Sequence, residues 1–293
     1  MMQEEYFEEY KKRYKKLKEI SEEVWKLVDN IMKEEKISII RLTNEIEKKI
    51  IELGAKPAFP VNISINEIAA HYTAEFEDFE IDLEKHMVKV DFGIMIDGYI
   101  FDTAKTYYNG EYYEIVEAAK KAFEESLKEI KAGNKINTPG KIVEEIAAQY
   151  KLKPIRNLGG HGLGLYRIHT EPSLINTNFE TNEEFIAGMP IAWEVFITNG
   201  SGYVKDSFPS LIFEIKNLDR LNLIRLPQAR KVIEYCYENF KTMPFAKRWI
   251  PFDKNIVNYA IAEGIRFDII HEYPVLKEVK NSFVAQFETT IIV

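Results

Sequence analysis

Residues 88–106 read Val88-Lys-Val-Asp91-Phe-Gly-Ile-Met-Ile-Asp-Gly98-Tyr-Ile-Phe-Asp102-Thr-Ala-Lys-Thr106. Two β-rich runs flank Asp97-Gly98, a dipeptide typical of a type I′ hairpin turn. With this turn, Gly93 pairs with Asp102, and Asp91 lies on the same face, diagonal to Asp102 and roughly 7–8 Å away. Carboxylates buried in so apolar a hairpin need positive charge beside them, and their oxygens suit hard divalent ions. The alternative is an edge hairpin with two solvated aspartates.

The composition is that of an ordinary globular chain. Its 293 residues are 46% hydrophobic and 29% charged, which allows a sizeable core. A net charge of −8 argues against general nucleic-acid binding. No apolar run approaches the ~18 residues of a membrane span, and the charged N-terminus is unlike a signal peptide, so we expect a cytoplasmic protein. The single cysteine, Cys236, excludes an intrachain disulfide and a multi-cysteine zinc site.

Hydrophobic periodicity predicts helices and strands in a repeating order. The expected helices are residues 3–35, 43–54, 113–131 and 138–150, and the expected strands besides the hairpin are 61–65, 191–197 and 283–293. Residues 66–73 are expected to form a turn-like stretch, and the acidic run 75–80 a solvated loop. The order helix, helix, strands occurs twice, which indicates an α+β fold with an internally duplicated unit.

Residues 202–270 differ in character from the rest and contain no motif of their own. A strand-like segment at 203–215 precedes helices at 226–240 and 256–263, the second closed by Gly264. Because this segment separates two strands that each carry a glutamate, it is interpreted as an insertion. The predicted organisation is a catalytic domain formed by 1–201 and 271–293, with a helical subdomain at 202–270.

A glycine-rich segment surrounds His161, and His169 follows eight residues later. The glycines do not form G-x-G-x-x-G, and Pro172 and Pro190 interrupt the βαβ unit which that motif requires, so a dinucleotide site is not expected. Glycines beside a histidine let the backbone come close to whatever the ring binds.

Glu194 and Glu288 each stand inside an apolar strand, where an unpaired charge is costly, although either could singly face solvent. With Asp91, Asp102 and His161 they make an oxygen-rich set with one nitrogen. Such a set favours a pair of divalent ions over one tetrahedral zinc. Four carboxylates brought together would repel one another unless cations neutralise them. The sequence therefore predicts that these five side chains converge.

Several short motifs stand in order from about residue 38 to the end of the chain. They are Lys56-Pro-Ala-Phe-Pro60, Ala70-His71-Tyr-Thr73, Asp91 with Asp102-Thr-Ala104, Gly160-His161, Arg167-Ile-His169, Glu194, Tyr273-Pro-Val-Leu276 and Phe287-Glu288. In this combination the chain resembles a type 2 methionine aminopeptidase of the short archaeal kind. The resemblance implies the pita-bread fold with its pseudo-twofold duplication, and a small helical, winged-helix-like subdomain at 202–270.

The resemblance also implies the metal ligands. Asp91 would chelate one ion, Asp102 and Glu288 would bridge two ions, and His161 and Glu194 would complete the other site. The implied cofactors are two divalent ions per chain, drawn from cobalt, manganese, iron and zinc.

The resemblance further implies the residues that meet the substrate. His71 and His169 match two histidines that are not ligands and that would donate hydrogen bonds to the peptide or the tetrahedral intermediate. Phe59, Ile168 and Tyr273 match positions that line the methionine side-chain pocket, and such a lining suits a flexible thioether.

The chain departs from the usual pattern of the family at four places. Val195 stands where proline is frequent, Thr170-Glu171 replaces Ala-Gly, Gly162-Leu-Gly164 is richer in glycine, and Thr289 stands where histidine is common. None of these changes removes a ligand, and Glu171 adds a negative charge near the mouth of the site.

The expected activity is removal of the N-terminal methionine from nascent proteins when the second residue is small. A hydroxide shared by two ions would attack the methionine carbonyl, with Glu194 as the proton acceptor. Two alternatives share the fold: an Xaa-Pro peptidase, whose larger N-terminal domain does not fit before Asp91, and a non-catalytic ribosome- or RNA-binding relative, which would lack ligands. The expected partners are nascent peptides, with the ribosome as a further candidate, no membrane and no specific nucleic acid; the expected state is a monomer.

Overall fold

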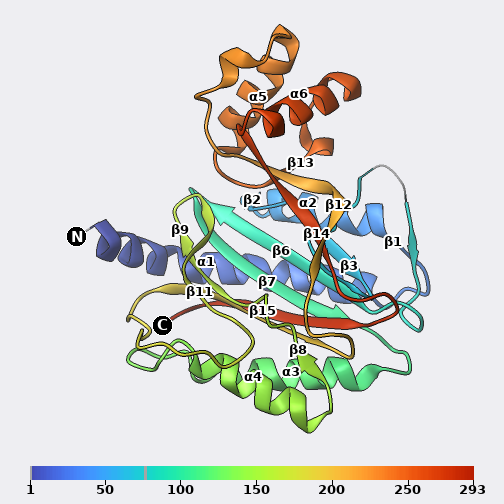
Figure 1. The fold of residues 1–293 in the computed structure, drawn as a ribbon, viewed down its shortest axis with the longest axis vertical. Helices are drawn as coiled ribbons and strands as arrows, with labels where there is room; N and C mark the ends of the chain where they lie inside the picture. Colours follow the sequence, from blue (N-terminus) through green and yellow to red (C-terminus); the bar gives the residue numbers. More distant parts are fainter. Residues whose placement is uncertain (1, 76–77) are drawn as a thin grey trace.

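The computed structural model describes residues 2–75 and 78–293 and contains a large curved sheet covered by helices (Figure 1). The strands of this sheet are β2 (Lys56–Pro57), β3 (Asn62–Ile65), β6 (Val88–Ile96), β7 (Tyr99–Tyr107), β8 (Lys153–Pro154), β9 (His161–Gly164), β10 (Arg167–Ser173), β11 (Pro190–Thr198) and β15 (Val284–Ile292). Their order is β10-β9-β11-β15-β7-β6-β2, with β3 paired to β6 and β8 paired to β11. The predicted strands are therefore neighbours in one sheet.

The predicted hairpin forms as β6 and β7. Gly93 pairs with Asp102 and Ile96 with Tyr99, as the Asp-Gly turn requires. Asp97 and Gly98 both have positive φ values, 52° and 88°, which is the conformation of a type I′ turn. The register that places Asp91 and Asp102 on one face is confirmed.

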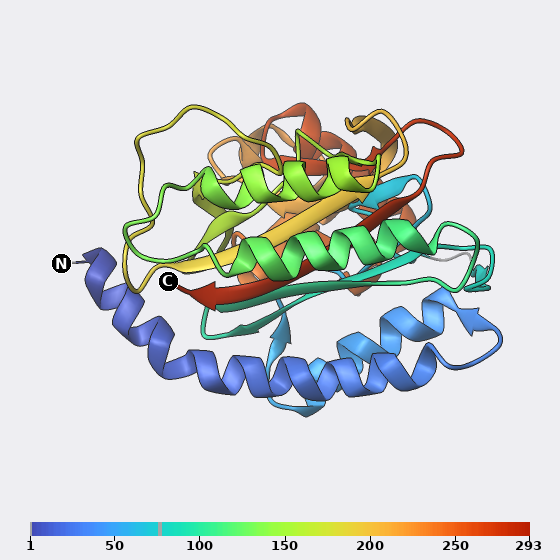
Figure 2. The same ribbon diagram turned by 90° about the horizontal axis from the view of Figure 1, so that it is seen from below.

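Two pairs of helices cover the outer face of the sheet (Figure 2). Helices α1 (Met2–Ile31) and α2 (Ile39–Glu52) pack on the β6/β7 half, and α3 (Tyr113–Leu127) and α4 (Thr138–Gln149) pack on the β11/β15 half. Each half thus combines a helix pair with neighbouring strands, as the predicted duplication requires. Helix α2 begins four residues earlier than expected, because the Ser38 side chain caps it by accepting from the Arg41 amide. Helix α3 ends four residues earlier than expected.

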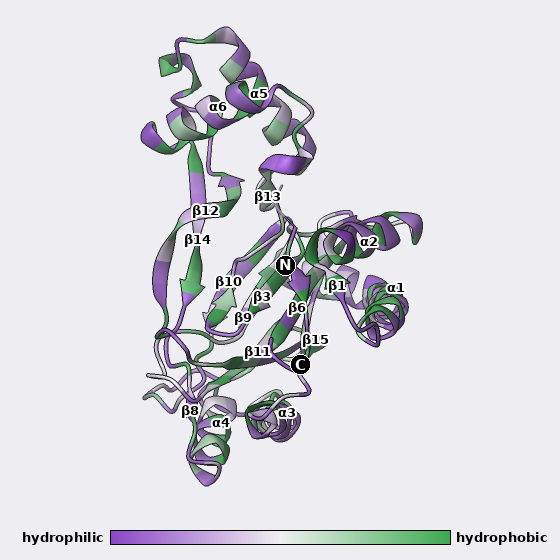
Figure 3. Ribbon diagram, turned by 90° about the vertical axis from the view of Figure 1, so that its right-hand side faces the viewer, coloured by the Kyte–Doolittle hydropathy of each residue, from purple (hydrophilic) through white to green (hydrophobic). Residues whose placement is uncertain are grey.

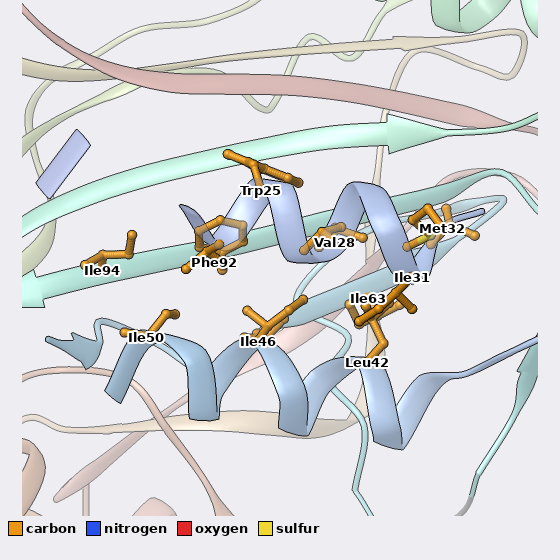
Figure 4. Packing of buried hydrophobic residues seen from close by; sticks show 14 of the residues in the cluster. Trp25, Val28, Ile31, Met32, Leu42, Ile46, Ile50, Ile63, Phe92 and Ile94 are labelled. Carbon is orange, nitrogen blue, oxygen red and sulfur yellow. The ribbon is translucent and has the colours of Figure 1, made fainter. Parts of the chain in front are cut away.

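Apolar side chains join the first helix pair to the sheet (Figure 4). Trp25 and Val28 of α1 and Ile46 of α2 lie with Phe92 and Ile94 of β6 in one buried cluster. Burial of each such side chain contributes roughly 1.5–3 kcal/mol relative to exposure. Hydrophilic and hydrophobic residues alternate along the outer helices, as expected for helices with one buried side (Figure 3).

The helices of the segment predicted as an insertion form the upper part of the molecule in Figure 1. The elements of this segment are β12 (Lys205–Ile215), the 3-10 turns Leu221–Leu223 and Lys247–Trp249, α5 (Pro227–Phe240), β13 (Phe245–Ala246) and α6 (Lys254–Arg266), followed by β14 (Ile270–Lys277). The helices surround a buried cluster that includes Cys236. Strands β12 and β14 join the helices to the rest of the chain, since β14 pairs with β4 (Ile68–Ala70). The boundaries at 202 and 270 and the winged-helix likeness stay predictions.

Three local expectations need correction. Residues 68–70 form strand β4 and are not turn-like throughout, because β14 supplies a pairing partner distant in sequence. Gly264 does not end α6 but lies inside it, where a Cβ atom would come within 2.5 Å of the Ile270 side chain. Of the acidic run 75–80, Glu80 belongs to β5 (Glu80–Ile81), which pairs with β1 (Ile37–Ser38), whereas residues 76–77 lie outside the described residues.

The described helices include none that combines the length and apolarity needed to cross a membrane.

Candidate metal centre

A cavity of about 580 Å³ is lined by residues of the large sheet and of the β12-β14-β4 sheet. The predicted site residues all line it: Phe59, His71, Asp91, Asp102, His161, Ile168, His169, Glu194, Tyr273 and Glu288. These residues are scattered over more than two hundred positions of the chain. The fold therefore brings the predicted residues together in one cavity. The role of each residue stays a prediction.

The sheet register places the four carboxylates together. Asp91 on β6 and Glu288 on β15 both pair with Ala104 of β7, from opposite sides. Asp102 lies two residues from Ala104 on β7, and Glu194 on β11 pairs directly with Glu288. Because alternate residues of a strand share a face, all four side chains project from the same side of the sheet.

Asp102, His161 and Glu288 form the tightest group. Their potential ligand atoms all lie within 4.8 Å of one another, and the three residues are buried. His161 Nε2 is 3.8 Å from Asp102 Oδ2, and His161 Nδ1 is 3.2 Å from the Gly162 carbonyl. Because a carbonyl only accepts, the proton resides on Nδ1, and Nε2 offers a lone pair toward the carboxylates.

The electrostatics of the group are strongly unfavourable without a cation. Burial raises the pKa of Asp91 to about 7. Burial, together with repulsion among the carboxylates, raises the pKa values of Asp102, Glu194 and Glu288 well above their usual range. Burial also lowers the pKa of His161 to about 4, so the ring is neutral and adds no positive charge. A cation among these oxygens would supply the missing charge.

The donor set fits a divalent cation. Asp91 Oδ1, Asp102 Oδ1 and Glu288 Oε1 are buried and have no hydrogen-bond partner within the described part of the chain. Buried acceptors without partners are rare in native proteins and indicate an ion or water at that place. Carboxylate oxygens with one imidazole nitrogen are ligands typical of divalent metals in hydrolases.

Gln286 is a member of the site that the sequence reasoning missed. Its Nε2 atom donates to Glu194 Oε2 and Glu288 Oε2, each at 3.3 Å. It therefore holds the two glutamates in place and leaves one oxygen of each for other partners. Gln286 stands two residues before Glu288, so both side chains lie on the same face of β15. This spacing in the sequence could have indicated that Gln286 belongs to the site.

Two histidines and a tyrosine form the opposite wall. His71 has a φ of 63°, and its Nδ1 lies 3.0 Å from the Pro274 carbonyl. The His169 ring centroid is 4.5 Å from that of His161, and the Tyr273 ring is 5.5 Å from that of His71. Burial lowers the pKa of His71, which favours the neutral ring with its proton on Nδ1. In this tautomer Nε2 is an acceptor, and the catalytic role of His71 stays a prediction.

The apolar side of the cavity contains Phe59 and Ile168, both buried in one cluster. Phe59 packs directly on the hairpin, because a Cβ atom on Gly93 would lie 2.5 Å from its ring. The Tyr273 hydroxyl donates to the Glu214 carboxylate, which fixes the tyrosine ring.

The glycines around His161 allow strands to approach one another. A Cβ atom on Gly160 would lie 2.5 Å from the Ala192 carbonyl, and one on Gly162 would lie 2.2 Å from the Glu171 carbonyl. The crowding comes from the neighbouring backbone of Ala192 and Glu171. It holds His161 beside β11.

The fold and the carboxylate–histidine centre define a metal-dependent hydrolase class, and comparisons with known proteins agree. The model of metallopeptidase family M24 matches residues 12–219. The chain is 41% identical to a methionine aminopeptidase of Archaeoglobus fulgidus over 88% of this chain and 86% of that one. It is 40% identical to a methionine aminopeptidase of Thermococcus onnurineus over 89% and 92%.

Solved structures show the same fold at lower identity. A thermophilic Arx1 aligns with a TM-score of 0.81 and 20% identity over 96% of this chain and 87% of that one. A methionine aminopeptidase of Thermotoga maritima aligns with a TM-score of 0.67 and 20% identity over 95% and 90%. The chain belongs to metallopeptidase family M24 and, within it, to the methionine aminopeptidases. The predicted pita-bread fold is confirmed.

Proposed function

We propose that this protein removes the N-terminal methionine from nascent proteins in the cytoplasm when the second residue is small. The observation that carries the proposal is the convergence of four carboxylates and His161 in one cavity. Methionine aminopeptidases at 35–41% identity over most of the chain support the substrate class. Two alternatives fit less well. An Xaa-Pro peptidase is disfavoured because the similar proteins are methionine aminopeptidases. A non-catalytic relative is disfavoured because the set of donor residues is complete.

We assign the residues that would hold the ions as follows. Asp91 would serve one ion, Asp102 and Glu288 would serve both, and His161 and Glu194 would complete the second site. The unpartnered oxygens of Asp91, Asp102 and Glu288 support this assignment. Bound divalent ions of the cobalt, manganese, iron or zinc type would acidify a water molecule and polarise the methionine carbonyl.

The residues of the chain itself bind and orient the peptide. Glu194 has one oxygen held by Gln286, and the other is available to accept the proton of the attacking water. His71, neutral and fixed by the Pro274 carbonyl, presents Nε2 to a peptide N–H group. Phe59, Ile168 and Tyr273 enclose the methionine side chain and exclude water from it.

Release of methionine from Met-Ala-Ser and Met-Leu-Ser, with and without added divalent metal, tests the proposal. Metal-dependent release should be fast from Met-Ala-Ser and slow from Met-Leu-Ser. Glu288→Ala should abolish it. Thr289→Ala is the matched control, since this neighbour pairs with Thr103 on the opposite face of the strand. Equal rates on both peptides would refute the selectivity, and activity in Glu288→Ala would refute the ligand assignment.

A further inference from the structure

The first four turns of α1 place tyrosines against the sheet at a spacing of four residues: Tyr6, Tyr10 and Tyr14. Tyr10 is fully buried. The match to family M24 begins at residue 12, so Tyr6 and Tyr10 lie outside it. Tyr6 and Tyr10 therefore belong to a part of the chain that the family model does not describe, although they pack close to the cavity.

Tyr10 makes its polar contact next to a proposed ligand. Its hydroxyl donates to the carbonyl of Ile100, two residues before Asp102 on β7. The regular pairing of β7 with β15 stops at Thr103, so the Ile100 carbonyl lies beyond the end of the ladder. One helical turn later, the Tyr14 hydroxyl donates to the carbonyl of Thr290 on β15, at 3.0 Å. The two tyrosine hydroxyls therefore donate to carbonyls of the adjacent strands β7 and β15, at the point where the hydrogen bonds between these strands end.

The ring of Tyr10 belongs to the apolar layer around the cavity. It lies in one buried cluster with Phe59, Ile168, Met95 and Leu163. Phe59 and Ile168 line the cavity, whereas Tyr10 does not. Tyr10 therefore shares its buried cluster with two residues of the cavity lining while lying outside that lining itself. In a close-packed interior, a loss of volume in this layer allows the wall to move.

We propose that Tyr10 is a specificity-determining positioning residue, whose ring supports the Phe59–Ile168 wall and limits the length of the N-terminal side chain that the pocket accepts. The proposal rests on the proposed function, because it concerns the methionine pocket. Removal of the ring would let the wall retreat, and the pocket would then admit a side chain one methylene longer than methionine. Discrimination by one methylene in an apolar pocket is worth roughly 10-fold or more in kcat/KM.

The test compares Met-Ala-Ser with ethionyl-Ala-Ser, whose side chain is longer by one methylene. The wild-type protein should prefer the methionyl peptide. Tyr10→Leu should lower this preference by about 10-fold, through a lower KM for the ethionyl peptide. Tyr10→Phe keeps the ring and should keep the preference. If Tyr10→Leu does not fold, Tyr10→Met is a milder truncation with the same expected direction.

Tyr6→Leu is the matched control. Tyr6 lies one turn earlier, stacks on Tyr99 at 5.5 Å between ring centroids, and its hydroxyl has no partner among the described residues. Tyr6 packs on the cluster from outside and is only partly buried, whereas Tyr10 is a buried member, so Tyr6→Leu tests loss of helix docking and should leave the preference unchanged. An equal loss of rate on both peptides in Tyr10→Leu, or the same change of preference in Tyr6→Leu, would overturn the proposal.

Failure of the proposed function would show differently, as a wild-type protein that cleaves neither peptide. Thermal-shift titration with free methionine and ethionine then decides the role of Tyr10. Ethionine should stabilise Tyr10→Leu at a lower concentration than it stabilises the wild type, whereas methionine should not. Equal concentrations for both proteins would refute the proposal.

Discussion

Glu194 and Glu288 stand directly opposite each other on the antiparallel strands β11 and β15. Like charges at such positions destabilise a sheet, and here burial raises the pKa of both groups. Two features offset this cost: the amide of Gln286, which bridges the two carboxylates, and the affinity of the set for cations. The placement of these two glutamates therefore favours metal binding, at a cost to the stability of the metal-free sheet.

Gln286→Leu should weaken the centre without removing a proposed ligand. The substitution keeps an apolar side chain of similar size but frees both glutamates to rotate. Loss of partners that orient ligands commonly costs 10–100-fold in metal affinity or activity. We expect a loss in this range, measured as the metal concentration that gives half-maximal activity. If Gln286→Leu needs the same metal concentration as the wild type, the Gln286 amide does not orient the glutamates.

The metal-free protein should lose stability as the pH rises. A carboxyl group whose pKa is raised in the folded state stabilises the fold at pH values below its unfolded pKa, near 4, and this stability is lost as the pH rises through the folded pKa. For Asp91 the folded pKa is about 7. The Tm of chelator-treated protein should therefore fall between pH 5 and pH 7.5, and added divalent metal should restore it at pH 7.5.

Asp91→Asn is the control for this pH dependence. Its metal-free form should show a smaller fall of Tm over the same range, because one of the repelling carboxylates is gone. A Tm that stays constant with pH in the metal-free wild type would show that the carboxylates are not held together without metal.

The sequence predicted those parts of the site that follow from local pattern. Alternation and the Asp-Gly turn defined the hairpin register, and a carboxylate inside an apolar strand marked each candidate ligand. Residues that act through distant partners were not predictable in this way. A helix predicted over residues 3–35 does not reveal that Tyr10 meets Ile100, and β4 exists because β14, two hundred positions later, pairs with it.

A largely buried ion pair joins the 3-10 turn Lys247–Trp249 to α2. Arg248 pairs with Glu47, and their side chains are only 11% and 12% exposed. Arg248 also donates to the Thr73 hydroxyl at 3.0 Å and to the Ala74 carbonyl at 2.9 Å. Trp249 Nε1 donates to the same carboxylate at 2.8 Å. These contacts hold the segment that follows His71.

Glu47→Ala should destabilise the protein by about 3–5 kcal/mol, because it leaves the Arg248 guanidinium buried without its counter-charge. Urea unfolding measures the change. Glu263→Ala is the control, since its partner Arg266 is 71% exposed and such pairs contribute at most about 1 kcal/mol. Similar losses in the two variants would show that Arg248 finds water or another partner when Glu47 is removed.

His71→Ala should lower kcat by roughly 10²-fold, in the range found for single hydrogen-bonding groups at reacting peptides. The neutral ring is fixed by the Pro274 carbonyl and by edge contact with Tyr273, so Nε2 is held ready for the peptide. Metal content, measured by elemental analysis, should stay that of the wild type, because His71 is not a proposed ligand. His86→Ala, near the other end of the hairpin, should leave both quantities unchanged. If His71→Ala lost metal together with activity, the ring would belong to the metal centre, and its assignment to the substrate would be wrong.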